Sequence, residues 1–153
     1  MTKIFSESLL TADGFYANIY FCVEPCVTCL VPGYLIVTPQ RPAVSLSQLE
    51  CSVLAALGPT LAAATRAIEV VIRPERVYCA LLAEETRSIH FHLFPRTEWL
   101  LPQYAAVHPG DHEISGSRLL DWARRTFPSP ISTDYTATVQ AIFRELELAV
   151  SES

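Results

Sequence analysis

Positive charge is scarce in this chain of 153 residues, in which 11 lysines and arginines stand against 16 acidic residues for a net charge of −5. Proteins that bind the nucleic-acid backbone rely on cations that displace its condensed counterions. The charge balance therefore argues against general nucleic-acid binding. A local site for a small phosphate compound remains compatible with it.

Long apolar runs and a secretory leader are also absent. The most apolar stretch, 19–37, is interrupted by Glu24, Pro25 and Pro32-Gly33, so no uninterrupted run of about 18 apolar residues is found. The first ten residues lack the apolar centre of a signal peptide. We therefore predict a cytoplasmic protein with no membrane partner. Because 50% of the residues are hydrophobic, the chain can bury a sizeable core, and its length favours one domain over 1–153.

The five cysteines are too few for a small disulfide scaffold, and their number is odd. Cys22, Cys26 and Cys29 have the spacing of a radical-SAM iron–sulfur motif. The chain is short for the barrel that such chemistry needs. A zinc site at Cys26 and Cys29 would need two more ligands, and no second Cys-x-x-Cys exists. We favour packed free thiols and predict no cofactor.

Hydropathy and turn-forming residues predict a mixture of strands and helices. Ser47 and Glu50 have the spacing of a capping box, and Gly58-Pro59 should bend or break the helix that follows. Strands followed by helices are typical of an α+β domain. The expected elements are strands at 15–23, 34–38, 76–83 and 87–94, helices at 47–71, 115–127 and 134–150, and a loop at 102–110.

The strongest chemical signal is a pair of histidines in 88–96, which reads Ser-Ile-His-Phe-His-Leu-Phe-Pro-Arg. Alternation along a strand places Ser88, His90 and His92 on one face and apolar residues on the other. Two imidazoles on one face can ligate a metal, pass protons, or combine a nucleophile with a phosphate-binding group. The alternative is a pair of solvated polar residues at the edge of a sheet.

A second segment, 32–42, reads Pro-Gly-Tyr-Leu-Ile-Val-Thr-Pro-Gln-Arg-Pro. Together the two segments resemble the histidine triad (HIT) superfamily of nucleotide hydrolases and transferases. That family has Pro-Gly-His, apolar residues, then Pro and a basic residue, followed by a long helix and a His-x-His-x-His strand that often ends in Pro-Arg. The Pro-Gln-Arg-Pro ending most resembles the fragile-histidine-triad branch. The resemblance covers about 15–100 and implies an α+β fold, a twisted antiparallel sheet packed by one long helix, with a helical extension at about 115–150.

The resemblance also implies an activity. The chain would act on a dinucleoside polyphosphate or a nucleoside phosphoramidate, as a phosphohydrolase or nucleotidyl transferase. His90 matches the family's nucleophile, which attacks the α-phosphorus to form a nucleotidyl-histidine intermediate. His92 matches the histidine that holds the phosphate oxygens. The family implies no metal, and it commonly forms homodimers.

Three positions depart from the family pattern. Ser88 replaces the first histidine of the triad, although its hydroxyl can still form a hydrogen bond. Cys26 stands where the family holds ribose with Asp or Asn, so ribose recognition would either be weak or pass to Glu24 or Thr28. Thr86 would supply the phosphate-contacting hydroxyl of the family's Gly-Gln-Ser/Thr element. These departures favour an alternative function, a nucleotide-binding or interaction module of the same fold with little or no turnover.

Other charged residues carry no functional prediction. Glu84 and Glu85 would repel a phosphate substrate and are expected to point to solvent. Arg124 and Arg125 are expected on the solvated face of a C-terminal helix.

Overall fold

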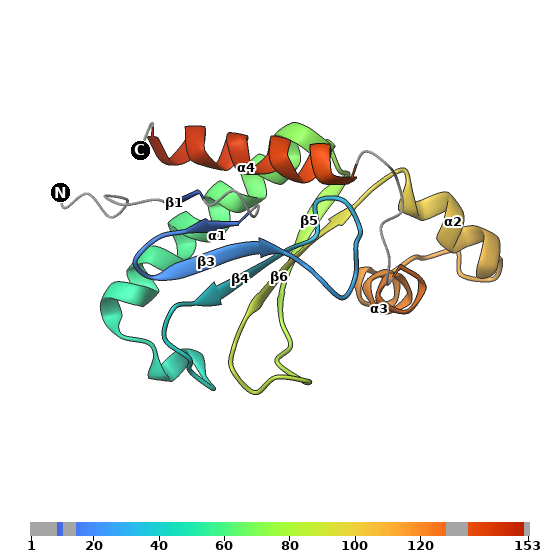
Figure 1. Cartoon of the computed structure of the whole chain (residues 1–153). Coiled ribbons are helices and arrows are strands. Elements are labelled where there is room, and N and C mark those ends of the chain that lie inside the picture. The colour runs from blue at the N-terminus through green and yellow to red at the C-terminus, as the bar shows by residue number, and fades with distance from the viewer. Residues whose placement is uncertain (1–8, 11–14, 128–134, 152–153) are drawn as a thin grey trace.

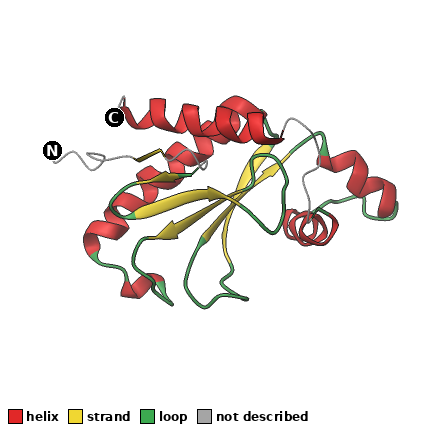
Figure 2. Cartoon of the chain, in the orientation of Figure 1, coloured by secondary structure: helices red, strands yellow, loops and turns green. Residues whose placement is uncertain are grey.

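The computed structural model describes residues 9–10, 15–127 and 135–151, and within them six strands form one antiparallel sheet in the order β1-β2-β3-β4-β6-β5 (Figures 1 and 2). The fold is therefore α+β, as predicted. The strands are β1 (Leu9–Leu10), β2 (Tyr16–Ala17), β3 (Phe21–Pro25), β4 (Leu35–Pro39), β5 (Arg76–Leu81) and β6 (Phe91–Arg96). The helices are α1 (Cys51–Ile72), α2 (Leu100–Val107), α3 (Gly116–Thr126) and α4 (Tyr135–Ser151), with a 3₁₀ turn at Leu46–Gln48.

One face of the sheet is covered by α1, along which α4 packs (Figure 1). Alanines at 56, 64 and 67 are buried and let α1 approach the strands closely. By length and composition α1 also qualifies as a membrane-spanning helix, which the sequence analysis did not predict. The core on this face joins strand residues to both helices and includes Phe21, Val23, Leu35, Val37, Phe91, Leu93, Ile68, Ile142, Phe143 and Leu146.

A second apolar cluster lies where α2 and α3 pack beside the sheet, around Tyr34, Phe94 and Leu119. Arg96 ties α3 to the sheet, because its Nη1 donates to the Ile114 carbonyl at 2.8 Å and to the Tyr78 hydroxyl at 3.2 Å. A Cβ at Gly116 would lie 2.5 Å from the Tyr78 ring, so only glycine permits this approach at the start of α3.

The predicted strand over 15–23 is wrong in its continuity, because the chain turns between β2 and β3. Asn18 causes this turn. Its Oδ1 accepts hydrogen bonds from the backbone amides of Tyr20 at 2.9 Å and Phe21 at 2.7 Å. The strand predicted at 76–83 ends at residue 81, and the strand predicted at 87–94 begins at residue 91. Residues 82–90 therefore form the connection between β5 and β6.

The capping box predicted before α1 is also wrong. Ser45 caps the 3₁₀ turn instead, α1 begins one residue after Glu50, and the Glu50 carboxylate pairs with Arg41 at 3.1 Å. Pro59 lies inside α1, which nevertheless runs unbroken to Ile72. Packing along one whole side of this helix offsets the backbone hydrogen bond that proline removes.

In the C-terminal region, the two predicted helices are present as α3 and α4. The loop predicted at 102–110 is wrong, because most of it belongs to α2. Pro102 is the third residue of α2, where the amide needs no partner within the helix, so proline is accepted there. The Pro-Ser-Pro sequence at 128–130, between α3 and α4, lies outside the described residues.

Candidate active site

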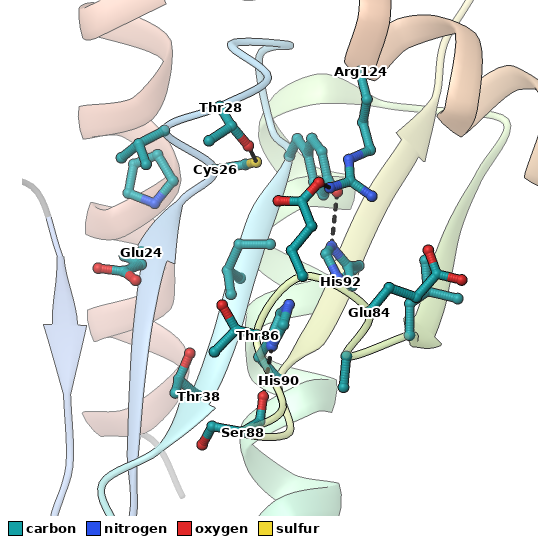
Figure 3. A pocket seen from close by; sticks show the side chains of 17 residues that line it. Glu24, Cys26, Thr28, Thr38, Glu84, Thr86, Ser88, His90, His92 and Arg124 are labelled. Carbon is teal, nitrogen blue, oxygen red and sulfur yellow. Dashed lines mark hydrogen bonds and ion pairs between the residues drawn. The ribbon is translucent and has the colours of Figure 1, made fainter. Parts of the chain in front are cut away.

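A pocket of about 310 Å³ opens on the sheet face opposite α1. Its walls come from the end of β3 and the turn after it, from β4, from the 82–90 connection, from β6 and from α3 (Figure 3). The structure brings together all six residues singled out from the sequence: Cys26, Thr28, Thr86, Ser88, His90 and His92. Alternation brings the two histidines there, because Phe91 and Leu93 enter the core while His90 and His92 face the pocket.

His90 lies immediately before β6, and its orientation comes from the main chain. Its Nδ1 is 3.0 Å from the carbonyl oxygen of Ser88. A carbonyl only accepts, so Nδ1 must carry the proton in this hydrogen bond. The lone pair of a neutral His90 ring therefore lies on Nε2, which is the arrangement that a nucleophilic imidazole requires.

His92 is almost fully buried within β6, with 5% of its surface exposed. Its Nδ1 lies 2.7 Å from the Tyr34 hydroxyl, and its ring centroid lies 4.8 Å from that of His90. Burial, together with the neighbouring His90 and Arg124, which act in the same direction, lowers the pKa of His92 to about 4. Burial also raises the pKa of Tyr34, so the hydroxyl keeps its proton. At neutral pH the pocket thus holds a neutral imidazole at this position.

Stability is expected to rise as the pH increases from about 4 to 6.5, because of His92. In this window the unfolded chain protonates His92 while the folded protein keeps the ring neutral. The unfolded state binds more protons, so the free energy of unfolding increases with pH, by at most about 3 kcal/mol for this group. Urea unfolding across the window should give a shallower pH dependence for His92→Gln than for wild type. His112→Gln, at an exposed histidine, should keep the wild-type slope, and equal slopes for wild type and His92→Gln would refute the assignment.

Cys26 and Thr28 lie in the turn after β3, where the Cys26 Sγ and the Thr28 Oγ1 are 3.5 Å apart. Cys26 is buried, whereas Thr86 is exposed in the 82–90 connection. Within the described residues, no group of three or more His, Cys, Asp or Glu side chains could hold a metal ion. Cys22, Cys26 and Cys29, which have the radical-SAM spacing, therefore do not form a cluster of metal ligands.

The sequence analysis missed Tyr34 and Arg124. Tyr34 stands where the family has the histidine of Pro-Gly-His. Arg124 was assigned to a solvated face, but it reaches from α3 toward His92 (Figure 3), and its Nη2 lies 3.2 Å from a carboxylate oxygen of Glu85. Glu85 itself was expected to point only to solvent, yet it lines the pocket while 81% of its side chain is exposed. No local pattern predicts that Arg124 and Glu85 meet at the pocket, because this depends on how α3 docks.

No family model and no curated protein matches this chain. Solved structures do match it. One is a hypothetical histidine triad nucleotide-binding protein from Sulfolobus tokodaii, with a TM-score of 0.60 and 14% identity over 93% of this chain and 85% of that one. A zinc-bound histidine triad family protein from Mycobacterium smegmatis gives a TM-score of 0.59 and 15% identity over 90% and 86% of the two chains. The chain has the histidine triad fold.

A third structure extends this comparison. The histidine triad protein from Bradyrhizobium japonicum matches with a TM-score of 0.58 and 18% identity, over 91% of this chain and 98% of that chain. The shared histidine triad fold thus extends beyond the 15–100 region that carries the sequence resemblance. The fragile-histidine-triad branch, the homodimer and the cytoplasmic location stay predictions.

Proposed function

We propose that this pocket is the active site of a nucleotide phosphohydrolase or nucleotidyl transferase in which His90 is the nucleophile. The observation that carries the proposal is the hydrogen bond from His90 Nδ1 to the Ser88 carbonyl, which leaves the Nε2 lone pair free. Neutral imidazole is a good nucleophile near pH 7 and needs no base to activate it. The matching solved structure described as nucleotide-binding supports the ligand class.

The reaction proceeds in two displacements at the α-phosphorus of a nucleoside phosphoramidate or a dinucleoside polyphosphate. In the first, Nε2 of His90 forms a bond to phosphorus, and the P–N or P–O bond to the leaving group breaks. The leaving group departs with the electron pair and takes a proton from water. In the second, the oxygen of water or another acceptor bonds to phosphorus, the P–Nε2 bond breaks with its electron pair returning to the ring, and the acceptor's proton passes to solvent, which replaces the proton taken in the first step.

His92 binds the phosphate oxygens as negative charge builds on them. When the Tyr34 hydroxyl donates to Nδ1 of His92, the Nε2–H of His92 is available to donate to a phosphate oxygen. Because His92 is buried and neutral, it is held in place before substrate arrives and costs little reorganisation during the reaction. The pocket volume of about 310 Å³ lies at the lower end of the usual range for small-molecule sites.

The covalent intermediate provides the direct test. Full-length protein would be mixed with adenosine 5′-phosphoramidate or a diadenosine polyphosphate, quenched without acid, and examined by intact-mass spectrometry and peptide mapping. A nucleotidyl adduct on His90 is expected in wild type and in the control His112→Ala, and it should be absent from His90→Ala. Nucleotide binding without any adduct or turnover would reject the enzyme and support the alternative, a binding module of this fold.

A further inference from the structure

An ion pair at the pocket joins two segments that are distant in sequence. Arg124 extends from α3, and Glu85 belongs to the 82–90 connection; the guanidinium Nη2 and the carboxylate oxygen are 3.2 Å apart. The Arg124 side chain is 28% exposed and the Glu85 side chain is 81% exposed. Figure 3 shows Arg124 reaching from its helix toward His92. The guanidinium thus lies beside the proposed phosphate-binding ring.

The charges around the pocket are poorly matched to a phosphate substrate unless Arg124 takes part. Among the described residues that line the pocket, the carboxylates are Glu24, Glu84 and Glu85, and Arg124 is the one Lys or Arg side chain. His92 contributes hydrogen bonds but no positive charge at neutral pH. A phosphate ester that enters this pocket therefore meets three carboxylates, and among the described lining residues Arg124 is the cationic side chain that can attract it.

We propose that Arg124 binds the phosphate of the substrate and that Glu85 occupies this guanidinium until the phosphate displaces it. This inference rests on the proposed function for the identity of the ligand as a nucleotide. Carboxylate and phosphate oxygens both accept from the planar fork of a guanidinium, so they compete for the same donors. Glu85 is mostly exposed, so its pair with Arg124 is weakly held and readily exchanged. The freed carboxylate returns to water.

The exchange makes Glu85 an internal competitor of the substrate. It keeps Arg124 at the pocket in the free protein, and a ligand that lacks a phosphate leaves the ion pair in place. Neutral nucleosides should therefore gain nothing from Arg124. The pocket would thus distinguish ligands first by whether they carry a phosphate group, and only then by their base or sugar.

Binding of AMP, inorganic pyrophosphate and adenosine, measured by titration calorimetry on the full-length protein, tests this inference without any turnover. Arg124→Met should weaken AMP and pyrophosphate binding by about tenfold or more while leaving adenosine affinity unchanged. Arg124→Lys should restore part of the loss, because it keeps the charge but not the fork. Arg125→Met is the matched control, since Arg125 pairs with Asp121 on the same helix and does not line the pocket. Equal AMP and pyrophosphate affinities in wild type and Arg124→Met would overturn the role of Arg124.

The competition by Glu85 is tested with a double-mutant cycle. Glu85→Gln should strengthen AMP binding by roughly two- to fivefold, and in the Arg124→Met background this gain should fall to that of Glu84→Gln, which reflects charge repulsion alone. Glu84→Gln, which removes a pocket carboxylate outside the ion pair, should have the same effect in both backgrounds. A gain from Glu85→Gln that stays undiminished without Arg124 would overturn the exchange. The two proposals can fail separately. If phosphate binding depends on Arg124 but no adduct forms on His90, the proposed reaction is refuted and this inference stands.

Discussion

The His90→Ala variant is expected to lose about a thousandfold or more in kcat/KM toward nucleoside phosphoramidates and dinucleoside polyphosphates. The reason is that the variant lacks the atom that bonds to phosphorus, and no second imidazole can replace it. His92 is neighbouring, but its Nδ1 is engaged with Tyr34 and its ring lies buried in β6. Steady-state release of the nucleoside monophosphate measures the loss. Binding of AMP should survive in the variant, because the remaining pocket is unchanged.

His112→Ala is the matched control for this prediction. His112 is exposed and does not line the pocket, so its removal changes the histidine content of the protein without touching the proposed site. Its kcat/KM should equal that of wild type. Turnover that is equal in His90→Ala and wild type would exclude His90 as the nucleophile, whatever the substrate.

The second large effect is expected from Phe94→Ala, which should lower the free energy of unfolding by about 3–5 kcal/mol. Phe94 is fully buried on the sheet face that carries α2 and α3, and its ring packs edge-to-face with Tyr34 at a centroid distance of 5.2 Å. Truncation removes this contact and leaves a cavity beneath the residue that holds His92. Urea unfolding at neutral pH, monitored by circular dichroism, gives the change.

Phe127→Ala serves as the control in the same apolar cluster. Phe127 is only partly buried and packs beside Trp99 and Trp122, so its truncation should cost clearly less than that of Phe94. If Phe94→Ala lowers the free energy of unfolding by less than Phe127→Ala does, the stability of the cluster does not depend on the Phe94 ring.

The sequence alone was sufficient to predict that His90 and His92 share one face, because side chains alternate between the two faces of a strand. Ile89, Phe91 and Leu93 are buried, and this places His90 and His92 together on the other face. Pro32-Gly33, which interrupts the apolar stretch 19–37, forms a turn before β4. Gly33 has φ of 85° there, and a Cβ would lie 2.8 Å from the Ile72 side chain. These features follow from local geometry, which a pattern of residue types records directly.

The errors arose where a distant contact or a single side chain decides the local structure. Asn18 interrupts an otherwise β-forming stretch through two hydrogen bonds from its own neighbours. Pro102 suggested a loop, although its place in the first turn of α2 removes the usual objection. Arg124 could not be assigned to the pocket from sequence, because its reach depends on where Arg96 and Gly116 fix the start of α3.

The hydrogen bond that orients His90 has a consequence for how such proteins are recognised. The acceptor is a peptide carbonyl, which every amino acid supplies, so the choice of tautomer at His90 does not depend on which side chain residue 88 bears. Under the proposed mechanism, the side chain at the first position of the triad can then change while Nε2 of His90 keeps its electron pair. A search that demands three histidines in the strand would discard chains in which backbone geometry, and not a third ring, prepares the nucleophile.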